Sequence, residues 1–190
     1  AAVGEGRSAV DPIAGEGRGK NEGLEELPAA DRLTGHENHR ALMQGLDGEE
    51  ARGRRERRNF SVLVGDVDHF KQYNDAFGHP AGDDVLKAIS DIMREAARPV
   101  DCVARYGGEE FVVLMPDTSA ADALERAEHI RARLAATKFT GRQMTLRIRV
   151  ASFPADAATA DALLPNAAHA LSEAKPQGRD RADRPPAPIR

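Results

Sequence analysis

The chain has 190 residues, of which 41% are hydrophobic and 31% charged, and its net charge is −4. This length and composition are typical of one globular domain with some additional chain. The negative net charge argues against a nucleic-acid-binding surface, and no apolar run approaches the ~18–20 residues of a transmembrane helix, so we expect no membrane contact. The single cysteine, Cys102, cannot form an internal disulfide and favours a cytoplasmic protein.

Both ends of the chain are poor in large apolar residues. Residues 1–23 are rich in Gly, Glu, Arg and Ala, and residues 182–190 are rich in Asp, Arg and Pro. Such segments cannot bury enough surface to offset the entropy lost on ordering. We therefore predict a flexible linker or tail over 1–23, one folded domain over 24–181, and a disordered tail over 182–190.

The first half of the predicted domain contains helices and one buried strand. A short helix is expected over 24–33 and a second over 36–58, where the terminal charge run is interpreted as a solvated helix face. Residues 60–67 form a nearly continuous β-branched and apolar run, typical of a strand buried on both faces. A further helix is expected to begin at Asp83, because apolar residues with period 3.6 follow it.

The second half predicts two strands, a helix, a strand and a helix. Residues 103–105 and 111–115 flank a tight Gly-Gly connection, which is typical of a hairpin. A helix is expected over 121–134, a strand over 145–151 and a final helix over 166–174. The resulting order is the split βαβ pattern, so we predict an α+β, ferredoxin-like sheet with antiparallel pairs and packed helices.

Acidic residues gather at two points of this predicted sheet. Asp66 and Asp68 end the buried strand and alternate onto one face, while Glu109 and Glu110 follow two glycines at the hairpin. Taken singly, each has a plain alternative, because an Asp can cap a turn and Gly-Gly is ordinary hairpin chemistry. Carboxylates converging from neighbouring strands repel one another unless a cation lies between them. Their oxygen atoms suit Mg²⁺.

Four segments resemble the motifs of one family, in the same order and at the same spacing. The hairpin sequence RYGGEEF resembles the signature of the GGDEF family in its GGEEF form. The other three segments are DVDHFK at 66–71, similar to DxDxFK; the ND, GH and GD pairs within 74–83; and DRLTGHENHR at 31–40, similar to DxLTGxxNxR. The resemblance covers about residues 24–181.

This resemblance implies a fold similar to the nucleotidyl cyclase catalytic domain and a diguanylate cyclase activity. Two GTP molecules would be joined into cyclic di-GMP with release of pyrophosphate, assisted by two Mg²⁺ ions per active site, with Mn²⁺ as a substitute. Each chain would hold one GTP, so catalysis would need a homodimer. The chain would be cytoplasmic, or the cytoplasmic part of a larger sensor protein.

The resemblance also assigns roles to individual residues. The metal ligands would be Asp66, Glu109 and the carbonyl of Val67, with Glu109 also accepting the proton of the attacking hydroxyl. Lys71 would contact phosphate, and Glu110 would assist. The remaining substrate-binding residues would be Asn74, His79 and Asp83 near guanine, and Lys175 and Arg179 at the terminal phosphates.

The assignment of Asp83 to guanine has a chemical reason. Its carboxylate can accept hydrogen bonds from both N1–H and N2–H₂ of guanine, whereas adenine would leave it unpaired. An alternative role for Asp83 is as the N-cap of its helix.

A second ligand site is implied by Arg98 and Asp101, which resemble the family's inhibitory Arg-x-x-Asp before the Gly-Gly pair. The site would bind the product cyclic di-GMP, since an arginine can donate to both O6 and N7 of guanine. A surface ion pair is the alternative. A further arginine in the following helix often completes this site in the family, and the candidate position here carries His129, with Arg131 two residues later.

Two segments depart from the family pattern. Arg147-Ile148-Arg149 stands where the family typically has Ser-Ile-Gly, which adds bulk in a strand. In the last helix, Ala168 and Ser172 replace the usual Asp and Tyr, and Pro176 is expected to end the helix early.

Three functions therefore remain open. The first is an active cyclase, favoured by the intact acidic motifs. The second is a catalytically impaired receptor for cyclic di-GMP or GTP. The third is an interaction or dimerisation module, which needs none of these acids.

Overall fold

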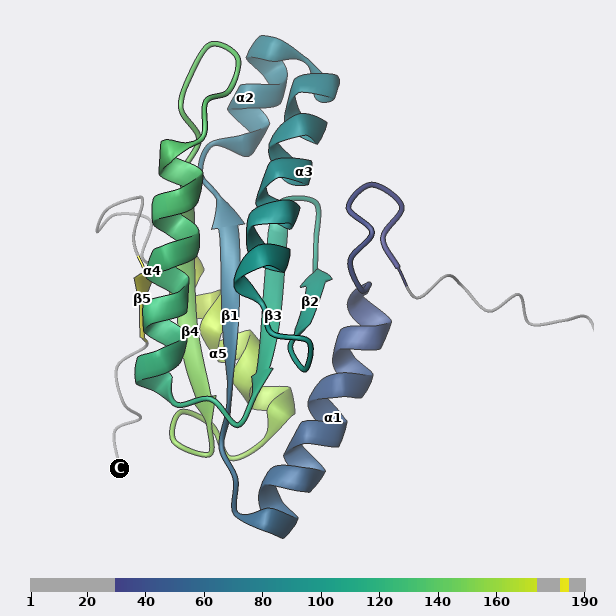
Figure 1. Cartoon of the computed structure of the whole chain (residues 1–190), viewed down its shortest axis with the longest axis vertical. Helices are drawn as coiled ribbons and strands as arrows, with labels where there is room; N and C mark the ends of the chain where they lie inside the picture. The colour runs from purple at the N-terminus through teal and green to yellow at the C-terminus, as the bar shows by residue number, and fades with distance from the viewer. Residues whose placement is uncertain (1–29, 174–181, 185–190) are drawn as a thin grey trace, which may run out of the picture.

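A five-stranded sheet lies between two layers of helices in the computed structural model, which describes residues 30–173 and 182–184 (Figure 1). The elements run along the chain as α1 (His39–Glu56), β1 (Phe60–Val67), α2 (Phe70–Phe77), α3 (His79–Ala96), β2 (Cys102–Arg105), β3 (Glu110–Pro116), α4 (Ala120–Ala136), β4 (Leu146–Phe153), α5 (Ala160–Glu173) and β5 (Ala182–Asp183).

The strand β1 occupies the centre of the sheet, whose order is β2-β3-β1-β4-β5. It pairs antiparallel with β3 on one side and β4 on the other, and β2 continues the sheet antiparallel to β3. Only β5 among the described strands runs parallel to its neighbour, β4. The predicted α+β sheet with antiparallel pairs is confirmed, and the predicted strand 60–67 has the observed bounds of β1.

Successive residues of β1 enter two different cores. Leu63 packs with Ile89 of α3 and Ile130 of α4 in one cluster, on the face that α2, α3 and α4 cover. Val62 packs with residues of α1 and α5 in the other cluster. Figure 1 shows α3 and α4 in front of the sheet and α5 behind it. This alternation explains why the strand is apolar at nearly every position.

The structure corrects three of the predicted helices. Residues 30–33 form a bridge and a turn, because the Asp31 carboxylate accepts hydrogen bonds from the backbone of Leu33 and Thr34 at 3.2 and 2.9 Å. The helix expected from Asp83 begins at His79 and follows α2, which the sequence analysis missed. The last helix begins at Ala160 and contains Pro165.

The segment expected to be a C-terminal tail begins with β5, whose Ala182 lies opposite Ile148 of β4. Pro176, expected to end the last helix, lies outside the described residues. No helix of the described part of the chain is long and apolar enough to span a bilayer.

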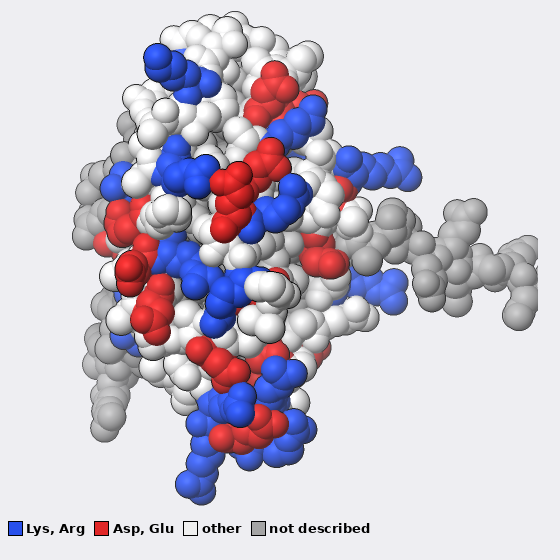
Figure 2. Space-filling view, in the orientation of Figure 1, with Lys and Arg blue, Asp and Glu red and all other residues white. Residues whose placement is uncertain are grey.

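Charged side chains of both signs alternate over the face formed by α3 and α4 (Figure 2). Basic side chains gather at the end of α1, where Arg54 pairs with Glu50 at 2.7 Å and Arg58 pairs with Asp117 at 3.1 Å. These exposed pairs agree with the interpretation of the charge run as a solvated helix face.

Candidate active site

The end of β1 and the beginning of β3 bring the two acidic segments together. Asp66 lies opposite Glu110 in the β1–β3 ladder, and the backbone N–H of Val67 donates to the carbonyl of Glu109 at 3.2 Å. The carbonyl of Glu110 accepts from the N–H groups of Tyr106 and Gly107 at 2.8 and 3.2 Å, which closes the hairpin.

A pocket of about 280 Å³ lies beside these strand ends. It contains four of the residues expected at the site, namely Asp66, Val67, Lys71 and Glu109. Lys71 enters it because His69 has φ 57°, a left-handed conformation that turns the chain from β1 into α2. Asp68, His69, Phe70, Gln72 and Arg147 complete the lining.

Glu110 is not among the residues that line this pocket. Its carboxylate lies against the backbone of Gly107, where a Cβ atom would come within 2.6 Å of Glu110 Oε2. A side chain at residue 107 would therefore clash with the Glu110 carboxylate in this position, and glycine avoids the clash.

The oxygen atoms of Asp66, Glu109 and the Val67 carbonyl have the chemistry that hard divalent cations prefer. No three His, Cys, Asp or Glu side chains are grouped closely enough to hold a metal ion within residues 30–173 and 182–184. Two carboxylates and a carbonyl fit Mg²⁺ sites that use one or two carboxylates and complete the shell with water and phosphate oxygens.

A basic side chain that had no role in the sequence analysis lies in the same pocket. Arg147 of β4 donates from Nη2 to Asp66 Oδ1 at 2.6 Å and from Nε to Asp68 Oδ1 at 2.7 Å. Its residue is 8% exposed, so both bonds are largely shielded from water. From the sequence, Arg147 was expected only to add bulk to the strand. The β1–β4 register, in which Asp66 lies opposite Arg147, could not be derived from the spacing of motifs.

The residues expected to recognise guanine lie on α2 and α3. The side-chain oxygen of Asn74 is buried and has no hydrogen-bond partner among the described residues. It lies against Gly82, where a Cβ atom would come within 1.8 Å of it. His79 is exposed and Asp83 half-buried. Asp83 is not an N-cap, because α3 begins at His79 with Gly78 in the N-cap position.

Lys175 and Arg179, expected at the terminal phosphates, lie outside the described residues. The structure brings the expected metal ligands and Lys71 together at the strand ends, and it places the expected guanine residues on the neighbouring helices.

A second polar site lies at the opposite end of β3. The carboxylate of Asp101 has no exposed surface and accepts from Arg98 Nη2 and Arg126 Nη1, each at 2.8 Å. Arg98 Nη2 also donates to the carbonyl of Pro116 and to Thr118 Oγ1, both at 2.7 Å. The hydrogen bond to Asp101 raises the pKa of Arg98, which keeps this guanidinium charged.

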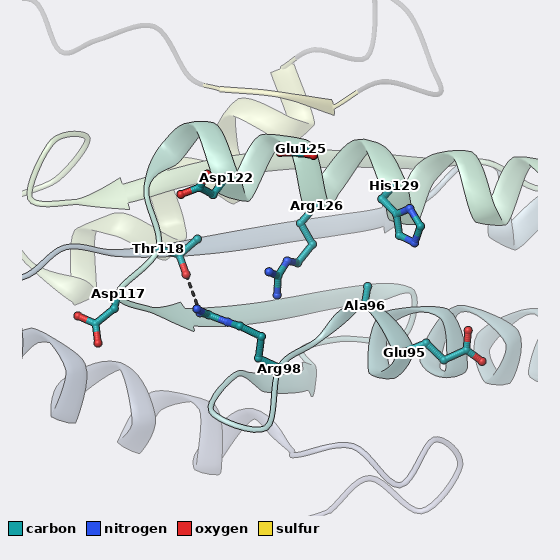
Figure 3. A pocket seen from close by; sticks show the side chains of 9 residues that line it. All are labelled: Glu95, Ala96, Arg98, Asp117, Thr118, Asp122, Glu125, Arg126 and His129. Carbon is teal, nitrogen blue, oxygen red and sulfur yellow. Dashed lines mark hydrogen bonds between the residues drawn. The ribbon is translucent and has the colours of Figure 1, made fainter.

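The arginine that joins this pair is Arg126, whereas the sequence pointed to the position of His129, with Arg131 nearby. Figure 3 shows Arg126 extending from α4 toward Arg98 across a pocket of about 550 Å³. His129 lies on the same side of α4 and also lines the pocket, while Arg131 pairs with Glu128 at 2.9 Å. Arg126 and His129 are three residues apart, so the helical period could have identified Arg126.

The family model "Diguanylate cyclase, GGDEF domain" matches residues 29–181. The chain therefore belongs to the GGDEF family.

Curated relatives agree with this assignment. The response regulator PleD of Caulobacter vibrioides is 41% identical over 161 residues, which cover 82% of this chain and 36% of that protein. The diguanylate cyclase DgcP of Pseudomonas aeruginosa is 43% identical over 155 residues, which cover 80% of this chain and 23% of that protein. The chain thus spans about a third or less of these two relatives.

Solved structures share the fold. The GGDEF domain of DgcB from Caulobacter crescentus, in complex with c-di-GMP, superimposes with a TM-score of 0.78 at 27% identity, covering 85% of this chain and 98% of that one. The active GGEEF domain of a diguanylate cyclase from Vibrio cholerae has a TM-score of 0.73 at 31% identity, covering 77% and 96% of the two chains.

Proposed function

We propose that this domain is a diguanylate cyclase that condenses two GTP molecules into cyclic di-GMP and pyrophosphate. The observation that carries the proposal is the meeting of Asp66, Val67 and Glu109 in a pocket that also contains Lys71. Acidic and basic groups at one point suit the transfer of a phosphoryl group, in which negative charge develops on oxygen. The matching of residues 29–181 to the family supports the proposal, and we place the domain limits at 24–181.

In this proposal, Asp66, Glu109 and the Val67 carbonyl hold divalent cations. When bound, two Mg²⁺ or Mn²⁺ ions would neutralise the triphosphate and stabilise the charge that develops on the α-phosphate. Glu109 accepts the proton of the attacking 3′-hydroxyl, with Glu110 nearby to assist. Lys71 and, beyond the described residues, Lys175 and Arg179 bind the phosphates.

We assign guanine recognition to Asn74, His79 and Asp83. The buried Asn74 oxygen has no hydrogen-bond partner among the described residues, and a guanine N–H group would satisfy it. Asp83 would accept from the other N–H donors of the base. Adenine has no N–H at position 1, so it would leave a desolvated oxygen unpaired.

The proposal requires two copies of the chain. One pocket holds one GTP, so two domains meet face to face and each contributes half of the product. The rate per chain therefore rises with protein concentration until the dimer is saturated.

We further propose that cyclic di-GMP inhibits the enzyme at Arg98 and Asp101, with Arg126 as a third contact. Two guanidinium groups face one pocket there, and arginine can donate to both O6 and N7 of guanine. The binding of c-di-GMP by the similar DgcB domain supports this assignment.

The test is incubation of the purified chain with GTP and Mg²⁺, followed by chromatography for cyclic di-GMP. We expect product from the wild type and at least a ~100-fold lower rate from Glu109→Ala, since positioned acid–base groups contribute about that much. Glu128→Ala, on the surface of α4, serves as the control and should retain the rate. Absence of product at every protein concentration would overturn the cyclase proposal.

One observation favours a second candidate function, a receptor without turnover. The ion pairs between Arg147 and the two aspartates place a cation at the carboxylate that catalysis would use for metal. A receptor would bind cyclic di-GMP, lose that binding in Arg98→Ala and form no product from GTP.

A further inference from the structure

Arg147 makes a hydrogen bond with each of its three side-chain nitrogens. Besides Nη2 to Asp66 and Nε to Asp68, its Nη1 donates to the carbonyl of Leu171 in α5 at 3.3 Å. The other carboxylate oxygen of Asp68, Oδ2, accepts a hydrogen bond from Thr145 Oγ1 at 2.8 Å. The guanidinium is thus held by Asp66 of β1, by Asp68 just after that strand and by the Leu171 carbonyl of α5.

The register of the sheet determines which arginine reaches the acids. Arg147 lies opposite Asp66 across the β1–β4 ladder, whereas Arg149 lies opposite the apolar Val64. Both arginines project from the face of β4 that α5 covers. Arg149 donates to the carbonyl of Arg184 at 3.4 Å in an exposed position. Two arginines on one strand therefore have different surroundings, and only Arg147 of the two bonds to an acid of the candidate site.

The guanidinium supplies the positive charge that neighbouring carboxylates otherwise require from a metal ion. It bonds to Asp66 and Asp68 through separate nitrogens, and charge-assisted bonds of this length are strong. A divalent cation coordinated by Asp66 would lie close to this fixed positive charge. The two cations would repel each other in a shielded site, where screening by water is weak.

We propose that Arg147 is a tethered counter-ion that competes with the divalent cation for Asp66. In the nucleotide-free protein Arg147 neutralises Asp66 and Asp68. A metal ion can bind to Asp66 only if the guanidinium moves away or if the binding energy exceeds the repulsion between the two cations. Arg147 thereby lowers the affinity of the candidate active site for a divalent metal ion. This inference rests on the proposed metal role of Asp66 in the cyclase.

The test measures Mn²⁺ binding to the nucleotide-free full chain by isothermal titration calorimetry. We expect Arg147→Ser to bind Mn²⁺ about tenfold or more tightly than the wild type, because the substitution removes a repelling charge beside the metal. Mutations next to metal ligands typically change the affinity by about 10–100-fold. Arg149→Ser removes the same charge from the same strand and should bind as the wild type does. Equal affinities of the wild type and Arg147→Ser, weaker binding by the variant, or no binding by either protein would overturn the proposal.

Folding of the variant needs its own check, because Arg147→Ser leaves Asp68 buried without its cation. Circular dichroism in the absence of metal establishes whether the variant is folded. If it is not, Arg147→Gln, which keeps most of the side-chain length and can still donate to Asp68, takes its place with the same expected result.

A parallel assay of cyclic di-GMP formation separates this inference from the cyclase proposal. Tighter Mn²⁺ binding by Arg147→Ser with no product from either protein would support the counter-ion and overturn the cyclase. Product from the wild type with unchanged Mn²⁺ affinity in Arg147→Ser would overturn the counter-ion alone.

Discussion

Asp101 and Arg126 are 25 residues apart in the sequence and are joined by an ion pair of 2.8 Å, in which the carboxylate has no exposed surface. This contact ties the loop before β2 to α4. Because Asp101 is fully buried, the loss of either arginine leaves part of a buried charge without a partner.

We expect Arg126→Ala to lower the free energy of unfolding by about 1–3 kcal/mol, the usual cost of an unsatisfied buried polar group. Urea denaturation would measure it. Arg133→Ala is the matched control on the same helix, because its pair with Glu95 is about half exposed on both sides and should contribute about 0–1 kcal/mol. Equal losses in both variants would mean that the Asp101 contact has no special energetic role.

Gly82 and Gly48 should respond in opposite directions to alanine. Both lie within helices, where alanine is normally preferred by about 1 kcal/mol. A Cβ on Gly48 meets nothing within 4 Å, so Gly48→Ala should stabilise the fold. A Cβ on Gly82 would collide with the Asn74 side chain, so Gly82→Ala should destabilise it by about 1–3 kcal/mol. Thermal unfolding of the two variants checks the sign.

The same Gly82→Ala variant tests the role of Asn74. Displacement of the Asn74 side chain should weaken GTP binding, measured by titration calorimetry, while Gly48→Ala leaves it unchanged. A Gly82→Ala protein that is folded and binds GTP normally would argue against Asn74 as a guanine contact.

His36 should make the protein less stable in mild acid. Burial lowers the pKa of this imidazole from its ordinary value of 6.5, and Nε2 lies 3.0 Å from the carbonyl of Ser90. The unfolded chain therefore binds a proton at His36 more readily than the folded one. The free energy of unfolding contributed by His36 is complete above pH 6.5 and decreases as the pH falls through that value toward the lower folded pKa.

Urea denaturation between neutral and mildly acidic pH measures this effect. His36→Gln, which keeps a donor for the Ser90 carbonyl, should reduce the slope of stability against pH in that range. An unchanged slope in the variant would show that other groups cause the acid sensitivity.

Cys102 should react slowly with thiol reagents in the native protein. Burial raises the pKa of its thiol to about 11, so little thiolate is present at pH 8. We expect reaction with Ellman's reagent to be about a hundredfold slower in the native protein than in urea, since the thiolate is the reactive form. Equal rates in the two conditions would contradict a half-buried, protonated thiol.

The sequence predicted correctly those parts of the fold in which burial determines the pattern of apolar residues. The strand β1 must be apolar on both faces because helices cover both, and its bounds were predicted correctly. The helix α2 and the first turn of α3 were missed, because the turn between the two helices depends on the single residue Gly78 with φ 86°, and α3 contains Pro80 in its first turn.

In the candidate site, the meeting of Asp66 with the hairpin acids followed from the motifs and the order of the strands. The contact between Arg147 and Asp66 did not, because these residues are 81 positions apart in the chain and their contact depends on the register of two strands, which no local pattern encodes. Arg126 was missed for a different reason, since the predicted contact was placed one helical turn further along the same side of α4, at His129.

The strand β3 has the proposed active site at its first residue, Glu110, and the proposed inhibitory pocket at its last, Pro116, whose carbonyl accepts from Arg98. Six steps of about 3.3 Å along a strand separate these ends by about 20 Å. A nucleotide at one end and a second ligand at the other would therefore not touch. An inhibitor bound at Arg98 would therefore not displace GTP, and one chain could hold both ligands at the same time. Such inhibition would be non-competitive with GTP.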